Sequence, residues 1–566
     1  MPPAPAAAVP PSAEPLIHLR VDGADLAVPD DGSSLLEVLR DRAGRRSVKD
    51  GCSPQGQCGC CTVWVDGAPR VACVTPVRRV AGREITTLDG LEPGVRGRWA
   101  DALLGSGGSQ CGFCTPGIVM RLAALACRPQ ETASVDVARL HQGLAAHLCR
   151  CTGWQTILEA AGLVAGDGPI VAAPGAGRDL SAAGVRATLE GGVDQRVGVE
   201  MALGEGGFAD DTCPPDALVA VPDGRGGYAV GETLADARRL AGKVQGRNVP
   251  GALDHPVAVP SGDWAVTLQT TWVEPAYLET DASWCEPGGV PAPACANGGA
   301  FGGKRHSPVP AAARRLADAH GRAVRVLWSR EDVVQLGPKR PPVGAGVSAD
   351  GGVLRVGVPA GPGDGADGGL GRCDASHEAQ WRAVLADVAA VAPDISVETA
   401  EVTGPPVSLD LRGALWAEAA ALAAAARGPG SGSGPEDGVE VVAPGGGRAI
   451  VRCPVGGPVE VEVHAGQPLD EVVLRSYCIG AVHQALGWVL SEGIAVGDTG
   501  EVRDLTVRSF GILPARAMPE VQVTVVGSGA PPVNGSDAVF AATAAACWIA
   551  QGLPATWPSD RSGARR

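Results

Sequence analysis

Three features are absent from this sequence of 566 residues, and each absence narrows its class. No run of about 18 apolar residues occurs, so no segment predicts a membrane-spanning helix. Glycine is abundant, at 81 residues, but it follows no Gly-X-Y period, which excludes a collagen-like chain. Positive charge is in the minority, with a formal net charge of -15, and an acidic chain is a poor partner for nucleic acid or an anionic membrane.

Lysine and targeting signals are scarce as well. Residues 1–15 are rich in proline and alanine and have neither a basic start nor an unbroken apolar stretch, so we expect a disordered tail and a cytoplasmic location. The lysines are Lys49, Lys243, Lys304 and Lys339, whereas arginine is frequent. This bias is typical of a GC-rich coding background, in which a single arginine or glycine carries little information.

Cysteine, in contrast, is plentiful and clustered. Of 17 cysteines, ten fall within the first 151 residues. Thiols stay reduced in the cytosol, so a cluster of cysteines there is more typical of metal binding than of disulfides. The sequence therefore predicts a metal-binding N-terminal part.

The first cysteine motif has a spacing close to that of plant-type ferredoxins, which bind a [2Fe–2S] cluster through C-x4-C-x2-C and a distant fourth cysteine. Its members are Cys52, Cys58, Cys61 and Cys73. The first gap is one residue longer than in that pattern. Cys60 is an alternative to Cys61, but Cys61 keeps the C-x2-C spacing. Glycines in the loop let backbone N–H groups approach the sulfurs.

The second motif combines a C-x2-C pair with a C-x-C pair: Cys111, Cys114, Cys149 and Cys151. The first pair lies at a predicted helix N-terminus, where amide groups and the helix dipole stabilise thiolates. The second pair follows the predicted end of another helix. Two helix ends could thus bring four thiolates together. A four-cysteine zinc site is the alternative, and the neighbouring ferredoxin-like motif disfavours it.

The element pattern divides the chain into regions of different character. Short strands, two hairpin turns and one helix predict a small α+β domain over residues 16–90. Helical periodicity follows over residues 91–165. Residues 166–199 are expected to be a linker, and the first part of this range is rich in glycine, proline and alanine. Residues 200–566 alternate short strands with Ala-rich helices. The fold class is therefore multidomain α+β.

Together the two cysteine motifs resemble the iron–sulfur region of the xanthine dehydrogenase family of molybdenum hydroxylases, over about residues 16–165. The resemblance implies a β-grasp ferredoxin domain and a helical-bundle domain, each with one [2Fe–2S] cluster. It implies that Cys52, Cys58, Cys61 and Cys73 hold one cluster, and that Cys111, Cys114, Cys149 and Cys151 hold the other. It also implies that Gln110 approaches a molybdopterin cofactor.

Residues 200–566 resemble that family's molybdopterin-binding domain only in separate segments. The resemblance implies a shortened α/β version of that domain. Gly298–Lys304 resembles the glycine loop near the metal centre, so Gly299, Phe301 and Gly302 are expected at the cofactor. Arg412 resembles an arginine in a neighbouring loop, and Gln484 lies in a Gly/Gln segment that the family uses around its pterin.

Two departures from the family pattern bear on catalysis. The family's Gly-x-Gly-Glu motif supplies a glutamate as general base, but the best match here, residues 527–532, has Ala530 at that position. Losing a general base typically costs about 10²–10⁴-fold in rate. Asp537 could take its place, although Asp537 or Ser536 as the cap of a helix beginning at Ala538 is the simpler interpretation.

No FAD or NAD site is evident. The one dinucleotide-like glycine pattern, over residues 363–368, precedes no helix and is interpreted as a loop. The resemblance implies an oxidoreductase that oxidises a heteroaromatic or aldehyde carbon with water. Its electrons would pass through both clusters to a separate FAD-containing subunit or other acceptor, in a homo- or hetero-oligomer. The alternative is a non-catalytic electron-transfer subunit with a remnant molybdenum domain.

Overall fold

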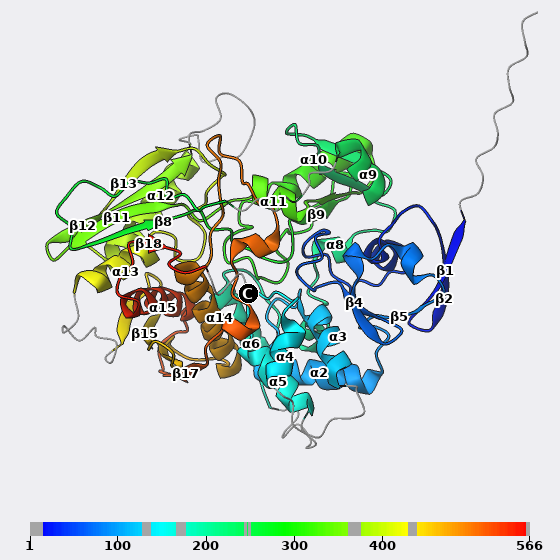
Figure 1. Ribbon diagram of the computed structural model, residues 1–566, viewed down its shortest axis with the longest axis horizontal. Helices are drawn as coiled ribbons and strands as arrows, with labels where there is room; N and C mark the ends of the chain where they lie inside the picture. The colour runs from blue at the N-terminus through cyan, green and yellow to red at the C-terminus, as the bar shows by residue number, and fades with distance from the viewer. Residues whose placement is uncertain are drawn as a thin grey trace, which may run out of the picture.

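The computed structural model describes residues 15–126, 137–165, 177–242, 246, 251–359, 375–427 and 438–561. Within these residues the strands form four sheets, with the N-terminal sheet at the right of Figure 1 and the last two sheets at the left. Almost all of the tail expected over residues 1–15 lies outside the described residues, and the whole of the dinucleotide-like pattern does so too.

The N-terminal sheet has the strand order β2-β1-β5-β3-β4. Its strands are β1 (Leu16–Val21), β2 (Ala24–Pro29), β3 (Thr62–Val65), β4 (Ala68–Val71) and β5 (Glu84–Thr86). Strand β1 pairs parallel with β5 and antiparallel with β2. A short helix, α1 (Leu35–Glu37), continues as a π-helical turn (Val38–Arg42), and Ser34 caps it in a capping box with Glu37. This sheet and helix form the expected β-grasp domain.

Four helices follow and form the expected helical domain. They are α2 (Pro93–Ser106), α3 (Thr115–Ala126), α4 (Val137–Leu144) and α5 (Gln155–Ala165). Helix α2 packs on α5, and α3 packs on α4 and on β3 of the first sheet. The two N-terminal domains therefore share one continuous apolar core.

A second sheet, with the order β7-β6-β10-β9, stands above these domains in Figure 1. Its strands are β6 (Leu218–Pro222), β7 (Tyr228–Gly231), β9 (Ala282–Cys285) and β10 (Val324–Leu327), and the helices around it are α8 (Ala209–Thr212), α9 (Leu234–Ala241), α10 (Val309–His320) and α11 (Arg330–Leu336). Helices α6 (Leu180–Gly191) and α7 (Val199–Ala202) precede this sheet in the chain and pack elsewhere, on α14 (Glu471–Leu490) and on α2. Strand β10 pairs parallel with β6 and antiparallel with β9.

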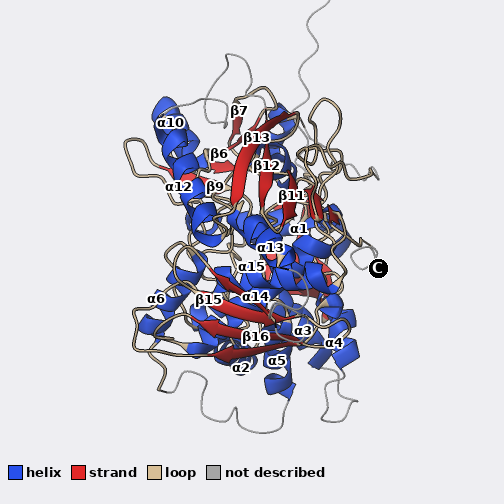
Figure 2. Cartoon of the chain, turned by 90° about the vertical axis from the view of Figure 1, so that its left-hand side faces the viewer, coloured by secondary structure: helices blue, strands red, loops and turns tan. Residues whose placement is uncertain are grey.

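The rest of the chain is a layer of helices between two sheets, as Figure 2 shows. One sheet has the order β13-β12-β11-β8-β18 and the other β14-β15-β16-β17. The strands are β8 (Val266–Thr270), β11 (Val343–Ser348), β12 (Gly351–Pro359), β13 (Ile395–Val402), β14 (Val439–Val442), β15 (Arg448–Arg452), β16 (Val459–His464), β17 (Val521–Val525) and β18 (Thr556–Trp557). The helices are α12 (Ala375–Val391), α13 (Trp416–Ala426), α14 (Glu471–Leu490) and α15 (Ser536–Ala550).

Helices α13, α14 and α15 are buried on nearly every side, and α13 and α15 are rich in alanine. Small side chains let these helices approach one another closely, and α15 packs on both α13 and α14. A helix that is apolar all round belongs in a core, which explains their place between the two sheets. Among the described residues, no helix is both long and apolar enough to cross a membrane.

Local predictions were wrong in three places. The sequence predicts a strand over Val71–Val74, but Ala72–Val74 is a 3₁₀ helix. Part of the expected linker forms α6, whose Arg186 and Glu190 are fully buried as an ion pair. Helix α15 begins at Ser536 rather than Ala538, its N-cap is Gly535, and neither Ser536 nor Asp537 caps it. Further 3₁₀ turns lie at Val77–Val80, Val507–Phe510 and Ala515–Ala517.

Candidate functional site

The cysteines of the first motif lie together in the loop between α1 and β3, with Cys73 arriving from the 3₁₀ helix after β4. The Cys52 thiol is in hydrogen-bond contact with the thiols of Cys58 and Cys73, and Cys73 also contacts Cys61. The hydrogen bonds from Cys58 and Cys73 hold the pKa of Cys52 well below its usual range. All four side chains are buried, so the group is shielded from water.

Backbone amides also point at these sulfurs. The Gln57 N–H donates to Cys52 Sγ at 3.5 Å, and the Cys73 N–H donates to Cys61 Sγ at 3.4 Å. Cys60 also lies beside the group, since its thiol contacts Cys58 and lies against Gly51. Each of the two cysteines contacts one member of the group, and the amide donor from Cys73 to Cys61 is the feature that favours Cys61 over Cys60 as the third ligand.

The second motif also converges. Cys111 Sγ lies 3.7 Å from Cys151 Sγ, and the thiols of Cys114 and Cys149 are in hydrogen-bond contact. The hydrogen bond from Cys114, together with donors at Thr152, lowers the pKa of Cys149 to about 6. A thiol whose pKa lies near neutrality is a ready metal ligand, because the thiolate is the form that binds metal.

The two cysteine groups are in direct contact through their backbones. The amide of Leu148, the residue before Cys149, donates to the carbonyl of Cys58 at 3.0 Å. The ring of His147 lies against Gly59, where an added β-carbon would be only 2.4 Å from it. One hydrogen bond and one peptide unit therefore connect a cysteine of the first group to a cysteine of the second.

Gln110 and the glycine loop lie beside the second group. The Gln110 side-chain amide donates to the Cys151 carbonyl at 3.2 Å and to Ser476 Oγ at 2.9 Å, while its buried Oε1 has no hydrogen-bond partner. At Gly299, an added β-carbon would lie 3.0 Å from Cys111 Sγ, so the loop touches the cysteines themselves. Gly302 has a φ of +93°, and its β-carbon position is 1.9 Å from the Asp410 carbonyl.

The remaining predicted residues meet at the far end of this loop. The Arg412 guanidinium lies over the Phe301 ring, 4.9 Å from its centre, and donates to Gln484 Oε1 at 3.3 Å. Its Nε donates to Asp537 Oδ1 at 2.7 Å, and it also bonds the Ser536 hydroxyl. Ser536 and Asp537 thus bind Arg412 instead of capping α15. Ala530 is exposed, outside this group.

Several charged residues at this place carried no signal in the sequence. The Arg340 guanidinium lies 3.9 Å over the Trp488 ring and pairs with Glu418, its Nη2 at 2.8 Å from Oε2. Arg150 Nη2 donates to Glu492 Oε2 at 2.9 Å. Arg150 stands between Cys149 and Cys151, and Arg340 ends the segment Gly337–Arg340 that resembles the family, so these positions could have drawn attention to them, whereas Glu418 and Glu492 belong to no motif.

These side chains leave a cavity of about 40 Å³. It is lined by Arg150, Glu274, Phe301, Arg340, Arg412, Gln484, Trp488, Glu492 and Phe540, among others. A water occupies about 10–15 Å³ by this measure, and pockets for organic ligands typically exceed about 300 Å³. The arginines are each paired with a carboxylate of the same chain. Molybdopterin does not fit the cavity with these side chains in place.

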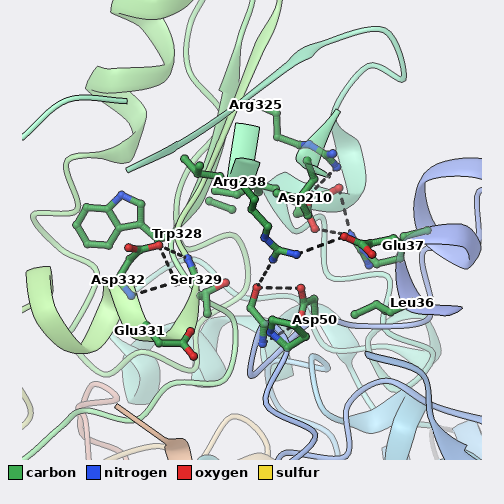
Figure 3. Close-up of a pocket in the computed structure, with 18 of the residues that line it drawn as sticks. Leu36, Glu37, Asp50, Asp210, Arg238, Arg325, Trp328, Ser329, Glu331 and Asp332 are labelled. Atoms are coloured by element: carbon green, nitrogen blue, oxygen red, sulfur yellow. Dashed lines mark hydrogen bonds and ion pairs between the residues drawn. The ribbon is translucent and has the colours of Figure 1, made fainter. Parts of the chain in front are cut away.

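A larger cavity, of about 180 Å³, lies beside the first cysteine loop, between the β-grasp domain and the second sheet (Figure 3). Arg238 projects into it from α9, pairing with Glu37 at 3.3 Å and donating to Ser53 Oγ at 3.2 Å. Ser53 in turn donates to Asp50, and burial raises the pKa of Asp50 to about 6. Because Ser53 follows Cys52 directly, this cavity reaches the edge of the first cysteine group.

No group of three or more His, Cys, Asp or Glu side chains in the described part of the chain is placed around a single metal ion. The cysteines form two groups of four, which is the ligand number of a [2Fe–2S] cluster. Fold and site together define a two-cluster iron–sulfur oxidoreductase architecture.

Family models match both N-terminal domains. Residues 18–78 match the 2Fe-2S iron-sulfur cluster binding domain, and residues 87–162 match the [2Fe-2S] binding domain. The xanthine dehydrogenase iron-sulfur-binding subunit of Escherichia coli O157:H7 is 43% identical over 134 residues, which cover 24% of this chain and 81% of that protein. The chain belongs to the xanthine dehydrogenase family of molybdenum hydroxylases.

Two further similarities extend this result. The aldehyde oxidoreductase of Megalodesulfovibrio gigas is 38% identical over 145 residues, 25% of this chain and 16% of that one. The solved structure of the aldehyde oxidoreductase from Desulfovibrio gigas matches with a TM-score of 0.68, at 13% identity, over 97% of this chain and 99% of the other. The second similarity shows that residues beyond the iron–sulfur region share the fold of that enzyme, including the expected α/β region.

The closeness of α14 to the second cysteine group gives a testable prediction. A β-carbon on Gly480 would lie 1.8 Å from the Cys151 carbonyl. We expect Gly480→Ala to push this loop away from α14 and to shift or abolish the EPR signal of the cluster at Cys151, in reduced protein. Gly162→Ala in α5 is the control, because nothing lies within 4 Å of that position. Identical spectra for both variants would contradict the contact.

Proposed function

We propose that this chain is an electron-transfer protein of the molybdenum hydroxylase family that holds two [2Fe–2S] clusters. Cys52, Cys58, Cys61 and Cys73 hold one cluster, and Cys111, Cys114, Cys149 and Cys151 hold the other. The observation that carries the proposal is the contact among thiols in each group, which links all four in the first group and joins the second as two pairs. When bound, such clusters supply one-electron transfer.

The roles of the surrounding residues follow from their contacts. The amides of Gln57 and Cys73 donate to sulfurs, which stabilises negative charge on them. Burial excludes water from the first group and from Cys114, Cys149 and Cys151 of the second. The hydrogen bond from Leu148 to the Cys58 carbonyl fixes the two groups relative to each other, as single-electron exchange between them requires.

A second candidate function is molybdenum-dependent oxidation of a heteroaromatic or aldehyde carbon with water. It is favoured by one observation, that Phe301, Arg412 and Gln484 meet beside the second cysteine group. The carrier is the better-supported function, because the cavity is about 40 Å³ and Ala530 offers no general base. For the enzyme to hold molybdopterin in this cavity, the side chain of Arg412 or Arg340 would have to move away from the carboxylate with which it pairs.

The partner that we propose is a separate redox protein, such as an FAD-containing subunit. The Escherichia coli relative is named as a subunit, which supports an assembly of several chains. The cavity at Asp50 and Ser53 adjoins the first cysteine group and supports electron exchange on that side.

Metal analysis and EPR of anaerobically purified protein test this proposal. We expect about four irons per chain and two distinct signals after reduction, because each [2Fe–2S] cluster contributes two irons and one unpaired electron. We expect no stoichiometric molybdenum, even from a host that makes molybdopterin. One molybdenum per chain would overturn the carrier in favour of the enzyme. Zinc in place of iron would refute both cluster assignments.

A further inference from the structure

A pair of cysteines lies far from both cluster groups. Cys453 directly follows β15, and Cys547 is in the C-terminal half of α15. Their thiols are in hydrogen-bond contact, although 94 positions separate them in the sequence. Strand β15 belongs to one of the two sheets and packs against α15 of the helical layer. This packing brings the two residues together (Figure 2).

The pair opens on a groove of about 600 Å³. Its walls are largely apolar and include Leu486, Leu490, Met518 and the exposed Val455. Cys453 and Cys547 both line it. A groove of this size admits a small organic molecule to the thiols, whereas thiols sealed in a core would not react.

The two thiols differ in exposure and in pKa, and these differences allow them to react one after the other. Cys453 is partly exposed, and the hydrogen bond from Cys547 lowers its pKa, so it is the thiol that ionises. Cys547 is 4% exposed, and the same hydrogen bond raises its pKa well above the usual value. An accessible thiolate backed by a buried thiol matches the attacking and resolving cysteines of thiol–disulfide exchange.

We propose that Cys453 and Cys547 form a redox-active dithiol that is oxidised to an intramolecular disulfide by low-molecular-weight disulfides entering the groove. The Cys453 thiolate attacks one sulfur of the small disulfide, whose S–S bond breaks as its other half leaves and takes up the proton that Cys453 lost. The Cys547 thiol then loses its proton to water and attacks Cys453 Sγ. The mixed disulfide breaks, and the second small thiol leaves. The protein gives up two electrons and two protons, and the small disulfide becomes two thiols.

Closing the bond requires only a local movement. A disulfide needs about 2.05 Å between sulfurs and about 4–7 Å between α-carbons, and thiols already in contact satisfy the second condition most readily. The bond would tie the end of β15 to α15. That helix also carries Ser536 and Asp537, which hold Arg412 at its other end.

Oxidised glutathione is the probe, applied to the full chain with its iron bound. Peptide mass spectrometry without reduction is expected to find the Cys453 and Cys547 peptides joined, with the loss of two hydrogen atoms, and to find them separate after dithiothreitol. Cys453→Ser should abolish both the joined peptide and any glutathione adduct at this site. Cys547→Ser should instead accumulate glutathione on Cys453, because the resolving thiol is missing.

Two controls keep the outcome interpretable. Cys213→Ser removes a buried thiol elsewhere and should leave the joined peptide unchanged. Cys547→Ala replaces the serine variant if buried serine disturbs α15, and circular dichroism reports whether each variant is folded. Absence of the joined peptide in the wild type would overturn the proposal. So would Cys547 variants that are folded yet carry no glutathione on Cys453.

Discussion

Replacing Cys149 with serine will remove the EPR signal of one cluster and leave the other in place. The Cys149 thiol is buried in contact with Cys114, and its pKa is lowered to about 6, so it is a thiolate near neutral pH. A serine hydroxyl does not ionise in that range and is a poor ligand for iron. Iron content should fall by about half, because one of two [2Fe–2S] clusters is lost.

Cys213→Ser provides the matched control for that experiment. Cys213 is also buried, but it lies outside both cysteine groups and its thiol donates to the Pro214 carbonyl, a bond that serine can reproduce. The control should keep both signals. Two intact signals in Cys149→Ser would refute the ligand assignment, whereas loss of both would show that the second group cannot be altered without unfolding the first.

Glu418→Gln will destabilise the chain strongly without touching a cysteine. Glu418 is fully buried and accepts two hydrogen bonds from Arg340, at 2.8 and 2.9 Å. Removing its charge leaves the Arg340 guanidinium buried without a counterion. Breaking such a pair typically costs about 3–5 kcal/mol in the free energy of unfolding.

Urea denaturation followed by tryptophan fluorescence measures this effect, since the Arg340 guanidinium lies directly over the Trp488 ring. Glu398→Gln is the matched control. Glu398 pairs with Arg355 at 2.9 Å, but the Glu398 side chain is exposed and that of Arg355 is half-buried, so the loss of this pair should cost no more than about 1 kcal/mol. Equal destabilisation by the two substitutions would contradict the importance of the buried pair.

The cysteine motifs could be predicted from sequence because their information is local. A few consecutive residues define the spacing of Cys58 and Cys61. The same is true of the turns at Asp22-Gly23 and Asp66-Gly67. Both turns do have the positive φ that those residues favour. The β-grasp and helical domains followed from such signals.

Long-range packing could not be predicted in this way. Arg340 and Glu418 are 78 positions apart and form no motif, so only the fold brings them together. The error at α15 has a similar origin. Ser536 and Asp537 are good capping residues in isolation, but the Arg412 guanidinium competes for their side chains. The same competition reduces the predicted cofactor cavity, because side chains from distant segments fill it.

The contact between α14 and the Cys149–Cys151 loop has a consequence for assembly. Gly480 lies directly against the Cys151 carbonyl, and Gln484 donates to the Arg150 carbonyl at 3.1 Å. In the Escherichia coli relative, the iron–sulfur part is named as a subunit. Here both sides of the contact belong to one chain, so it forms at a high effective concentration that does not change on dilution. Its stoichiometry is fixed at one to one by synthesis, whatever the abundance of other components in the cell.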